Sequence, residues 1–426
     1  MPSYCPAVAF VCLTWFVGCG AGVIEQEKEG EIADAAVEAA DAPLDQGVQP
    51  SDAGTESSVS DSSQPDAKPA APTEREVLIP LDGQVLFPAV VEGNPAYLVV
   101  DTGAVRSTFS KDLLRNVANG VGLATIDFGD DIHFEDYEVL AGDLSEAEKH
   151  IGSAIDGLIG QDLLQQLYFG VDYRRKRAIV AANAPANAPN GWTEADRITL
   201  PYELVQGLPV LSVDIEGKQA RLIADTGSGV TILTQSHVPS DWLDDGCKGY
   251  VWHTSYGSDE ATIVRIPSLG VGSSQVKNSW AIVVPDEHHL ASLFSAIGLE
   301  VDGFLGYPVY RSFYWGIRGA DQVYEVFAQP GQDPLASTEW NRVGVEIARA
   351  DNEVLIDMVF QPSDAFDKGI DVGDVLHAID GTVVDTLSLD DIRMRLRGSV
   401  GDARHLSFVR AGSSIEVDVA VESLIP

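Results

Sequence analysis

The sequence predicts a mainly β protein in which two tandem β-lobes are followed by a smaller α+β domain. Two observations predict the lobes. The tripeptide Asp-Thr-Gly occurs twice, each time directly after a short apolar run, at Asp101-Thr102-Gly103 and at Asp225-Thr226-Gly227. The residues before each triplet align without a gap, so the chain contains an internal repeat. A third observation, the strand and helix pattern after residue 338, predicts the C-terminal domain.

Each copy of the repeat also carries an apolar-apolar-glycine strand further along. Residues 155–160 read Ile-Asp-Gly-Leu-Ile-Gly, and residues 301–306 read Val-Asp-Gly-Phe-Leu-Gly. One such stretch is typical of any buried strand that ends in a turn, but its recurrence behind both triplets indicates a repeated element. Short strands with turn signals then fill each copy. We place the first lobe at residues 77–185 and the second at residues 196–330.

These motifs resemble those of the aspartic peptidases of the retropepsin and pepsin group. In that group, two lobes each contribute one Asp-Thr-Gly turn to a shared site. The segment of residues 156–164, Asp-Gly-Leu-Ile-Gly-Gln-Asp-Leu-Leu, is especially similar to the retropepsin segment that follows the catalytic turn. The resemblance covers about residues 77–330 and implies two retropepsin-like lobes that form a pepsin-like bilobed unit. Because one chain carries both lobes, we expect a monomer.

The resemblance implies that Asp101 and Asp225 are a catalytic pair. Two carboxylates held about 3 Å apart cannot both ionise, so they share one proton and titrate together. The charged carboxylate would act as general base on a water, and the protonated one would donate to the scissile carbonyl oxygen. This chemistry requires no metal and no other cofactor. We therefore expect an endopeptidase that hydrolyses peptide bonds in polypeptide substrates.

The other residues of the two turns are expected to support this pair. Gly103 and Gly227 allow the backbone to turn tightly beneath the carboxylates, where a Cβ would obstruct. Thr102 and Thr226, as the resemblance implies, would bond across to the backbone of the opposite lobe.

The two turns differ in the residue that follows each triplet, which is Ala104 in the first and Ser228 in the second. A serine hydroxyl can donate to the adjacent carboxylate and favour its charged form, so we expect Asp225 to be the more acidic member. The alternative function is a non-catalytic, lipid-anchored pseudo-peptidase, which binds peptides in the cleft without cutting them.

The second copy is 22 residues longer than the first between its triplet and its glycine strand. The extra length holds residues 251–258 and 262–266, which are typical of a hairpin with a glycine-containing tip. One interpretation is a single substrate-covering flap on the second lobe, with Trp252 or Tyr256 over the substrate and Gly257 at the tip. The alternative is an ordinary surface hairpin.

The N-terminal part of the chain indicates export. Residues 1–19 are apolar and end in Phe-Val-Gly-Cys, which resembles a bacterial lipobox whose Cys19 becomes lipidated after cleavage. No Lys or Arg precedes the apolar run, so an ordinary signal peptide is the alternative. Residues 20–76 are acidic and contain no aromatic residue, which predicts a disordered linker. We expect a cell-envelope protein facing the periplasm or cell surface, on the outer membrane where there is one, because Gly20 follows the cysteine.

Charge and cysteine content limit the partners. The net charge of −38 argues against nucleic acid and against close contact with anionic lipid, so membrane contact is expected only through the lipid anchor. Beyond the leader, Cys247 is the only cysteine and cannot form an internal disulfide. We expect it to be a buried or incidental thiol.

Residues 338–426 are expected to form a separate module. A Gly-Asp-Val-Leu segment at residues 373–376, an Ile-Asp-Gly segment at residues 379–381 and a helical run after them strongly resemble a PDZ domain. The resemblance implies an open sheet edge that binds extended peptides by strand addition. Its peptide-binding loop would be Val343, Gly344 and Val345, where one glycine stands in place of the usual two. The missing glycine argues against recognition of free C-termini and leaves internal segments or an intramolecular role. The alternative is a PDZ-like module that merely packs against the two lobes.

Overall fold

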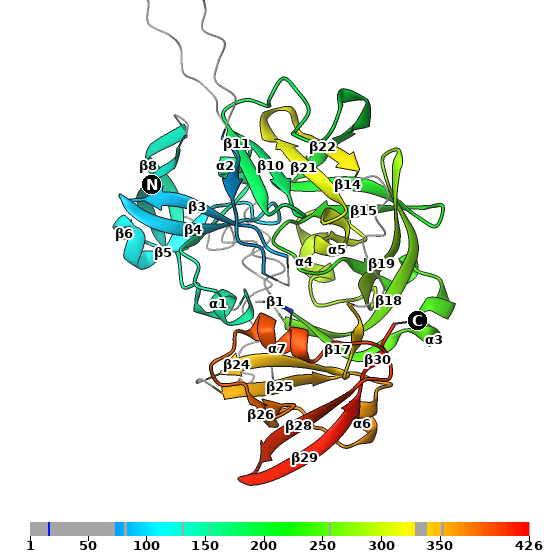
Figure 1. Cartoon of the computed structure of the whole chain (residues 1–426). Coiled ribbons are helices and arrows are strands. Elements are labelled where there is room, and N and C mark those ends of the chain that lie inside the picture. Colours follow the sequence, from blue (N-terminus) through cyan, green and yellow to red (C-terminus); the bar gives the residue numbers. More distant parts are fainter. Residues whose placement is uncertain are drawn as a thin grey trace, which may run out of the picture.

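The structure is a computed structural model that describes residues 16–17, 73–80, 83–129, 132–151, 153–254, 257–328, 339–350 and 353–425. It confirms the mainly β fold class (Figure 1). In these ranges no helix is long and apolar enough to cross a membrane. The expectations for Cys19, for Tyr256 and for almost all of the linker 20–76 concern residues outside these ranges.

The first lobe is a seven-stranded sheet that closes on itself. Its strand order is β3-β4-β9-β5-β8-β7-β6, and a further pairing of β3 with β7 gives it a barrel-like form. Apolar side chains alternate along β7, so one face of the sheet fills the interior. The strands are β3 (Leu86–Val91), β4 (Asn94–Val100), β5 (Thr108–Ser110), β6 (Arg115–Ala118), β7 (Val121–Gly129), β8 (Ile132–Gly142) and β9 (Gly157–Ile159).

The second lobe repeats this arrangement. Its nine-stranded sheet has the order β1-β17-β18-β19-β16-β20-β15-β14-β13 and closes through β14 and β18. Strand β1 (Phe16–Val17) comes from the leader and pairs with the end of β17. The other strands are β13 (Glu203–Val205), β14 (Leu208–Ile215), β15 (Lys218–Ala224), β16 (Ile232–Thr234), β17 (Cys247–Thr254), β18 (Gly257–Val271), β19 (Ser274–Val284) and β20 (Gly303–Leu305).

The pairing pattern shows that the sequence repeat is a structural repeat. The strand before each triplet runs parallel to the apolar-glycine strand of its copy, β4 beside β9 and β15 beside β20. The strand after each triplet, β5 or β16, is antiparallel to that same glycine strand. Each triplet therefore lies in the connection between two strands that flank the glycine strand of its copy.

A third sheet, to which both lobes contribute, joins them. Lobe-1 strand β10 pairs with lobe-2 strand β21, and Gly170 lies opposite Gly316. A Cβ on Gly170 would lie 1.9 Å from the Tyr314 hydroxyl, and a Cβ on Gly316 would lie 2.6 Å from the Tyr168 hydroxyl. The two phenols thus occupy the space that side chains would need. In sheet order the strands are β12 (Arg197–Pro201), β22 (Val323–Ala328), β21 (Phe313–Arg318), β10 (Tyr168–Asp172), β11 (Arg177–Ala181) and β2 (Arg75–Glu76).

The helices are short and lie between strands. They are α1 (Ser145–Ile151), α2 (Gln161–Leu164), α3 (Ser240–Asp245), α4 (Ala291–Ala296), α5 (Tyr307–Tyr310), α6 (Asp364–Asp367) and α7 (Leu389–Arg395), with 3-10 turns at Lys111–Leu113, Glu194–Asp196, Gln235–His237 and Gly319–Asp321. Helices α2 and α5 directly follow the two glycine strands, as the repeat requires.

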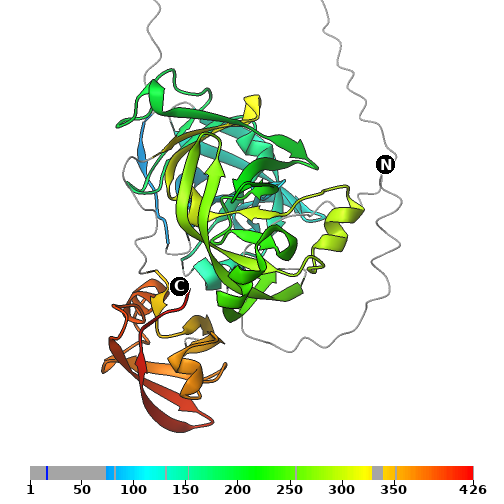
Figure 2. The ribbon, with the colours of Figure 1, turned by 90° about the vertical axis from the view of Figure 1, so that its right-hand side faces the viewer.

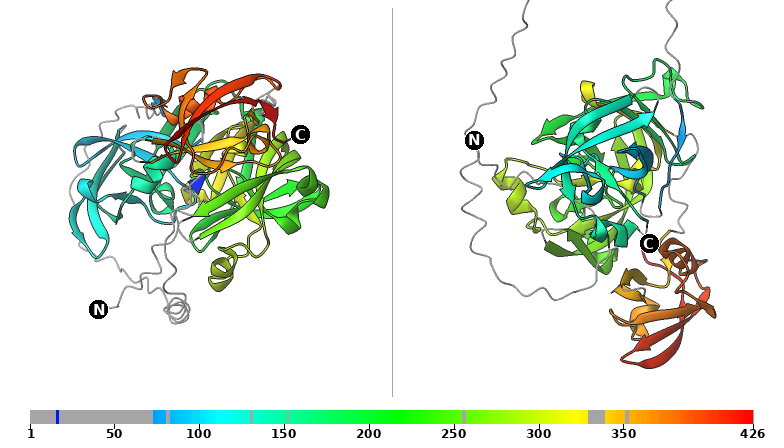
Figure 3. Two further views of the ribbon diagram at one scale, coloured as in Figure 1. Left: turned by 90° about the horizontal axis from the view of Figure 1, so that it is seen from below. Right: turned by 90° about the vertical axis from the view of Figure 1, so that its left-hand side faces the viewer.

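The C-terminal domain is a twisted sheet beside α7, which packs against the edge strand β24. It lies beneath the two lobes (Figures 1 and 2), and in the view from below in Figure 3 it lies in front of them. Its strands are β23 (Asn341–Arg342), β24 (Val345–Ala350), β25 (Glu353–Val359), β26 (Val375–Ile379), β27 (Thr382–Val383), β28 (Ala403–Arg410), β29 (Ser413–Ala420) and β30 (Glu422–Ser423).

This domain has a core of its own, but it also shares one with the second lobe. Met358 and Phe360 lie in the same buried cluster as Cys247, Tyr250 and Trp252 of β17. The module expected at residues 338–426 thus has a core of its own and also packs against the second lobe. Apolar residues on both sides of the junction exclude water from it, which favours a fixed position of the domain.

Candidate active site

The two triplets meet at the boundary between the lobes. Asp101 follows β4 directly and Asp225 follows β15 directly, and the carboxyl-bearing residues are only 2% and 0% exposed. Their backbone amides donate to equivalent carbonyls of the glycine strands, those of Ile159 and Leu305, each at 3.0 Å. The same strand geometry thus delivers both carboxyls to one place.

The glycines of the triplets show how closely each carboxyl approaches the turn of the opposite lobe. A Cβ placed on Gly103 would lie 2.5 Å from Cγ of Asp225, and a Cβ placed on Gly227 would lie 2.6 Å from Cγ of Asp101. Each carboxyl therefore lies against the turn of the opposite lobe, in the space that only a glycine leaves open. The structure brings the two aspartates together across the boundary.

The threonines lock the two turns to each other. The Thr102 hydroxyl donates to the Ala224 carbonyl and the Thr226 hydroxyl donates to the Val100 carbonyl, both at 2.7 Å. Each hydroxyl also accepts from the backbone amide of the opposite threonine, at 2.9 and 3.0 Å. These reciprocal bonds are buried, so they fix the relative position of the carboxyls.

Each carboxyl is oriented by its own turn. The Gly103 amide donates to Oδ1 of Asp101 at 2.9 Å, and the Gly227 amide donates to Oδ1 of Asp225 at 2.8 Å. The turn thus holds one oxygen of each carboxyl in place, and this is the preorganisation that general acid–base catalysis needs.

Ser228 does not act as the sequence suggested. Its hydroxyl donates to the Val230 carbonyl at 2.8 Å, within its own turn. The expected hydrogen bond from this hydroxyl to Asp225 is absent from the described contacts of Ser228, so it offers no basis for a more acidic Asp225.

Two buried glutamines that the sequence analysis missed also hold the turns. The Gln161 side-chain amide donates to the Thr102 carbonyl at 2.9 Å, and that of Gln84 reaches the Gly227 carbonyl at 3.4 Å. Gln161 directly follows the Leu-Ile-Gly signal, which is a usable sequence clue. Gln84 precedes the first strand of its lobe and carries no such clue.

The sequence also gave no sign of a group of buried tyrosines near the Asp101–Asp225 pair, which we call the dyad. Burial raises the pKa of Tyr173, Tyr310 and Tyr324, and the nearby charge of Asp225 contributes to each shift. All three phenols therefore stay protonated, and a hydrogen bond with the Thr102 side chain opposes part of the pKa shift of Tyr310 and Tyr324. Tyr173 directly follows β10, Tyr310 is the last residue of α5 and Tyr324 lies in β22, and sequence alone gave no reason to single them out.

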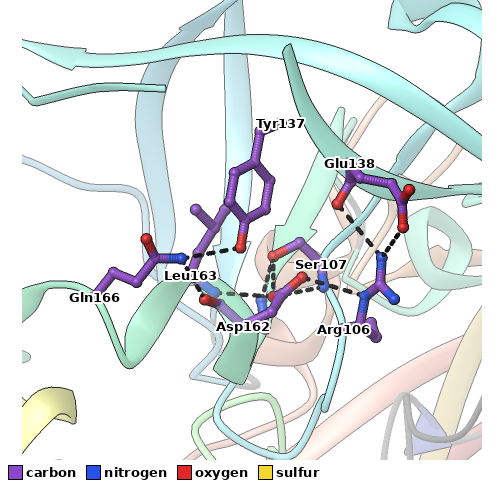
Figure 4. Close-up of polar contacts among 8 residues, drawn as sticks. Arg106, Ser107, Tyr137, Glu138, Asp162, Leu163 and Gln166 are labelled. Carbon is purple, nitrogen blue, oxygen red and sulfur yellow. Dashed lines mark hydrogen bonds and ion pairs between the residues drawn. The ribbon is translucent and has the colours of Figure 1, made fainter. Parts of the chain in front are cut away.

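A polar network of Arg106, Ser107, Glu138 and Asp162 supports the Asp101-Thr102-Gly103 turn (Figure 4). Oδ1 of Asp162 accepts from the amide and the hydroxyl of Ser107, at 2.9 and 2.7 Å. Arg106 forms an ion pair with Asp162 at 3.5 Å and another with Glu138 at 3.2 Å. Burial raises the pKa of Asp162, while the bonds from Ser107 lower it. The Gly160 amide donates to the Ser107 hydroxyl at 3.0 Å, so the network ties the triplet loop to the glycine strand.

The second lobe keeps only part of this network. Thr231 takes the place of Ser107 and accepts from the Gly306 amide at 3.3 Å. Pro308 stands where Asp162 would be, so no carboxylate follows the second glycine strand. In lobe 1, Gln166 donates to the Tyr137 hydroxyl at 3.1 Å on the outer side of the same network.

The long hairpin of the second lobe is β17–β18, and its lobe-1 equivalent is the much shorter β6–β7. Trp252 does not lie over a cleft: it is 1% exposed and packs against Phe304 at a ring distance of 6.0 Å. That part of the flap expectation is wrong, because Trp252 is a core residue of lobe 2. Gly257 begins β18, and Tyr256 lies outside the described residues.

Two of the three side chains are buried in the loop expected to bind peptides in the C-terminal domain. Val343 and Val345 are each 1% exposed, and the Val343 amide already donates to the Leu396 carbonyl at 3.1 Å. Gly344 has φ +80°, and a Cβ there would lie 2.4 Å from Oγ of Ser363. The Val343 amide is therefore already paired within the domain, and peptide binding by this loop stays a prediction.

No protein-family model and no curated protein matches the chain. Among solved structures, it is similar to an aspartic proteinase from Irpex lacteus, with 10% identity and a TM-score of 0.38, over 62% of this chain and 100% of that one. It is also similar to a photosystem II D1 C-terminal processing protease, with 22% identity and a TM-score of 0.20 over 21% of this chain. That match spans only 24% of the processing protease. Likeness at this level says nothing about activity, so the chemistry has to be inferred from the site itself.

Proposed function

We propose that this chain is an aspartic endopeptidase that hydrolyses peptide bonds through Asp101 and Asp225. One observation carries the proposal: each carboxyl lies against the glycine of the opposite turn, with 2.5 and 2.6 Å from the Cγ atoms to the positions that Cβ atoms would take. Two carboxyls forced together in a buried site share a proton, which provides one base and one acid at the same pH.

The charged carboxylate takes a proton from a water that attacks the scissile carbonyl carbon. The protonated carboxyl donates to the carbonyl oxygen, and the resulting tetrahedral intermediate breaks down when the leaving amine is protonated. The threonine bonds and the Gly103 and Gly227 amides keep both carboxyls in position, so little reorganisation is needed. The substrate is a polypeptide in an extended form, covered by the β17–β18 hairpin.

The test is the removal of one carboxylate at a time. Asp101→Asn and Asp225→Asn are each expected to abolish cleavage of an unstructured protein, because the two residues act as a unit. Asp156→Asn and Asp302→Asn are matched controls from the same repeat, where the side chains accept backbone amides outside the site. A statine-type transition-state mimic is expected to inhibit the parent.

Binding of that mimic without any cleavage would favour the alternative, a peptide-binding protein with an inactive dyad. Full activity of either Asn variant at the dyad would contradict the proposed mechanism. Loss of activity in the Asp156 and Asp302 variants as well, with the fold intact, would show that the effect is not specific to the dyad.

A further inference from the structure

The beginning of β17 is paired with the C-terminal domain. Lys248 and Gln361 exchange two backbone hydrogen bonds, at 2.6 and 2.8 Å, and form an antiparallel bridge. Reciprocal bonds of this kind are those of a β-ladder. One edge of the β17–β18 hairpin is thus held by the domain that follows the two lobes.

Side chains continue this contact along β17. The Tyr250 and Phe360 rings are stacked, with centroids 6.4 Å apart and planes inclined by 5°. The Val251 amide donates to Sδ of Met358 at 3.5 Å. Cys247, at the start of the strand, is 0% exposed in the same cluster. The C-terminal domain therefore packs against the first half of β17 and buries Cys247 and Tyr250, while Lys248 and Gly249 stay exposed.

The backbone of β17 comes unusually close to the C-terminal domain at Gly249. This residue has φ +88°, and a Cβ there would lie 2.6 Å from the Val359 carbonyl oxygen. That oxygen belongs to backbone and cannot swing aside as the end of a flexible side chain could. The position requires glycine for its conformation and for the close approach.

Polar contacts fix the rest of the junction. Glu339 forms an ion pair with Arg311 at 2.8 Å and accepts from the Trp280 indole at 3.3 Å. Arg265 donates to the Ile425 carbonyl at 2.8 Å. The lobe-1 hairpin β6–β7 has no comparable support among the described residues, and every residue of β6 is exposed. Beyond β17 the sheet has only the two-residue strand β1, so the beginning of β17 is an edge that gains from an external support.

We propose that the C-terminal domain positions the β17–β18 hairpin over the peptide cleft and is therefore needed for turnover even of short peptides. Met358, Phe360 and Gln361 are positioning residues that act through β17 without touching substrate. The inference rests on the proposed function, because the hairpin matters for turnover only if the cleft holds a peptide. It assigns the domain a role inside the catalytic unit in addition to any role in choosing substrates.

The test compares two glycines with the same backbone strain. Gly249→Ala pushes on the Val359 carbonyl, whereas Gly217→Ala, at φ +84°, meets nothing within 4 Å. Gly249→Ala is expected to lower kcat for a short peptide by about tenfold or more, because the cover is misplaced. Gly217→Ala is expected to change kcat by less than about twofold.

Cys247 gives a readout that does not depend on activity. Burial raises the pKa of its thiol to about 12, so it is unreactive while the junction is closed. In a full-length chain with Cys5, Cys12 and Cys19 changed to Ser, Gly249→Ala is expected to raise the rate of Cys247 labelling by a thiol reagent by about tenfold or more. Gly217→Ala is expected to leave that rate unchanged.

A second matched pair guards against simple misfolding. Phe360→Leu removes side-chain volume from the cluster shared with β17, while Phe408→Leu removes it from the domain's own core. Only Phe360→Leu is expected to lower kcat and expose Cys247. Normal kcat and labelling in Gly249→Ala and Phe360→Leu, with an active parent, would overturn this inference alone. A parent with no turnover would overturn the proposed function and the catalytic part of the inference, while the labelling rates would still show whether the junction holds the hairpin.

Discussion

Replacing Thr102 by valine removes one hydroxyl that serves both lobes. The Ala224 carbonyl loses its donor at 2.7 Å, and the Thr226 amide loses its acceptor at 2.9 Å. Both groups belong to residues that are at most 4% exposed, so water cannot easily replace the lost partner. An unsatisfied buried group costs about 1–3 kcal/mol, so Thr102→Val is expected to lower the free energy of unfolding by about 2–6 kcal/mol.

Urea unfolding of the parent, Thr102→Val and Thr102→Ser measures this effect. The serine keeps the hydroxyl, so its free energy of unfolding is expected to stay within about 1–1.5 kcal/mol of the parent. Thr199→Val, at an exposed position of β12, controls for the exchange of residue type. If Thr102→Val is no less stable than Thr102→Ser, the cross-lobe hydrogen bonds do not stabilise the site as argued.

Three further predictions concern other parts of the chain. Gly103→Ala is expected to abolish cleavage, because its Cβ would lie 2.5 Å from Cγ of Asp225, whereas Gly93→Ala, which meets nothing within 4 Å, is expected to leave it intact; peptide-cleavage assays compare the two. Metabolic labelling with a fatty acid is expected in the parent and not in Cys19→Ser, and an unlabelled, soluble parent would refute the lipid anchor. Burial, together with the charge of Glu346, raises the pKa of Asp357 from 3.8 to about 7, so folding stability falls by about 4 kcal/mol as pH rises from 4 to 8. Asp357→Asn is expected to remove that loss in thermal melts at pH 4 and pH 8, and equal melting shifts at both pH values would contradict the assignment.

The direction in which Asp357 changes folding stability with pH depends on the charge of Glu346 beside it. Burial alone would raise the pKa of Glu346, but the charges of Arg393 and Arg342 lower it to about 2. Glu346 therefore stays charged in the folded chain, and its stabilising contribution is lost only as pH falls below the usual range of a glutamate. Asp357 is the carboxyl that takes the proton, and its neutral form favours folding at low pH.

The repeated parts of the site could be predicted from sequence, because a repeat fixes both the residues and their surroundings. The placement of Asp101 and Asp225 needed only the triplets and the two glycine strands. Gln84 could not be found in this way, because its contact with the Gly227 carbonyl joins residues 143 positions apart in the chain.

Trp252 and the junction residues of the C-terminal domain escaped the sequence for one physical reason, which is that apolar residues do not reveal which surface they cover. Trp252 lies in the hairpin that was interpreted as a flap, but its side chain belongs to the lobe-2 core. Phe360 and Met358 fit the pattern of an ordinary domain core, yet they pack on β17. The Ser228 hydroxyl had a nearer acceptor in Val230, and local geometry of that kind is not encoded in residue spacing.

Because Thr102 and Thr226 exchange hydrogen bonds, the assembly of the centre depends on how the two halves are connected when the protein is diluted. Each half of the centre is incomplete by itself, so two unlinked halves would assemble only above the dissociation constant of their complex. On a single chain the second half is present at an effective concentration of about millimolar, whatever the total amount of protein. The centre therefore stays assembled at concentrations at which a pair of separate subunits would come apart.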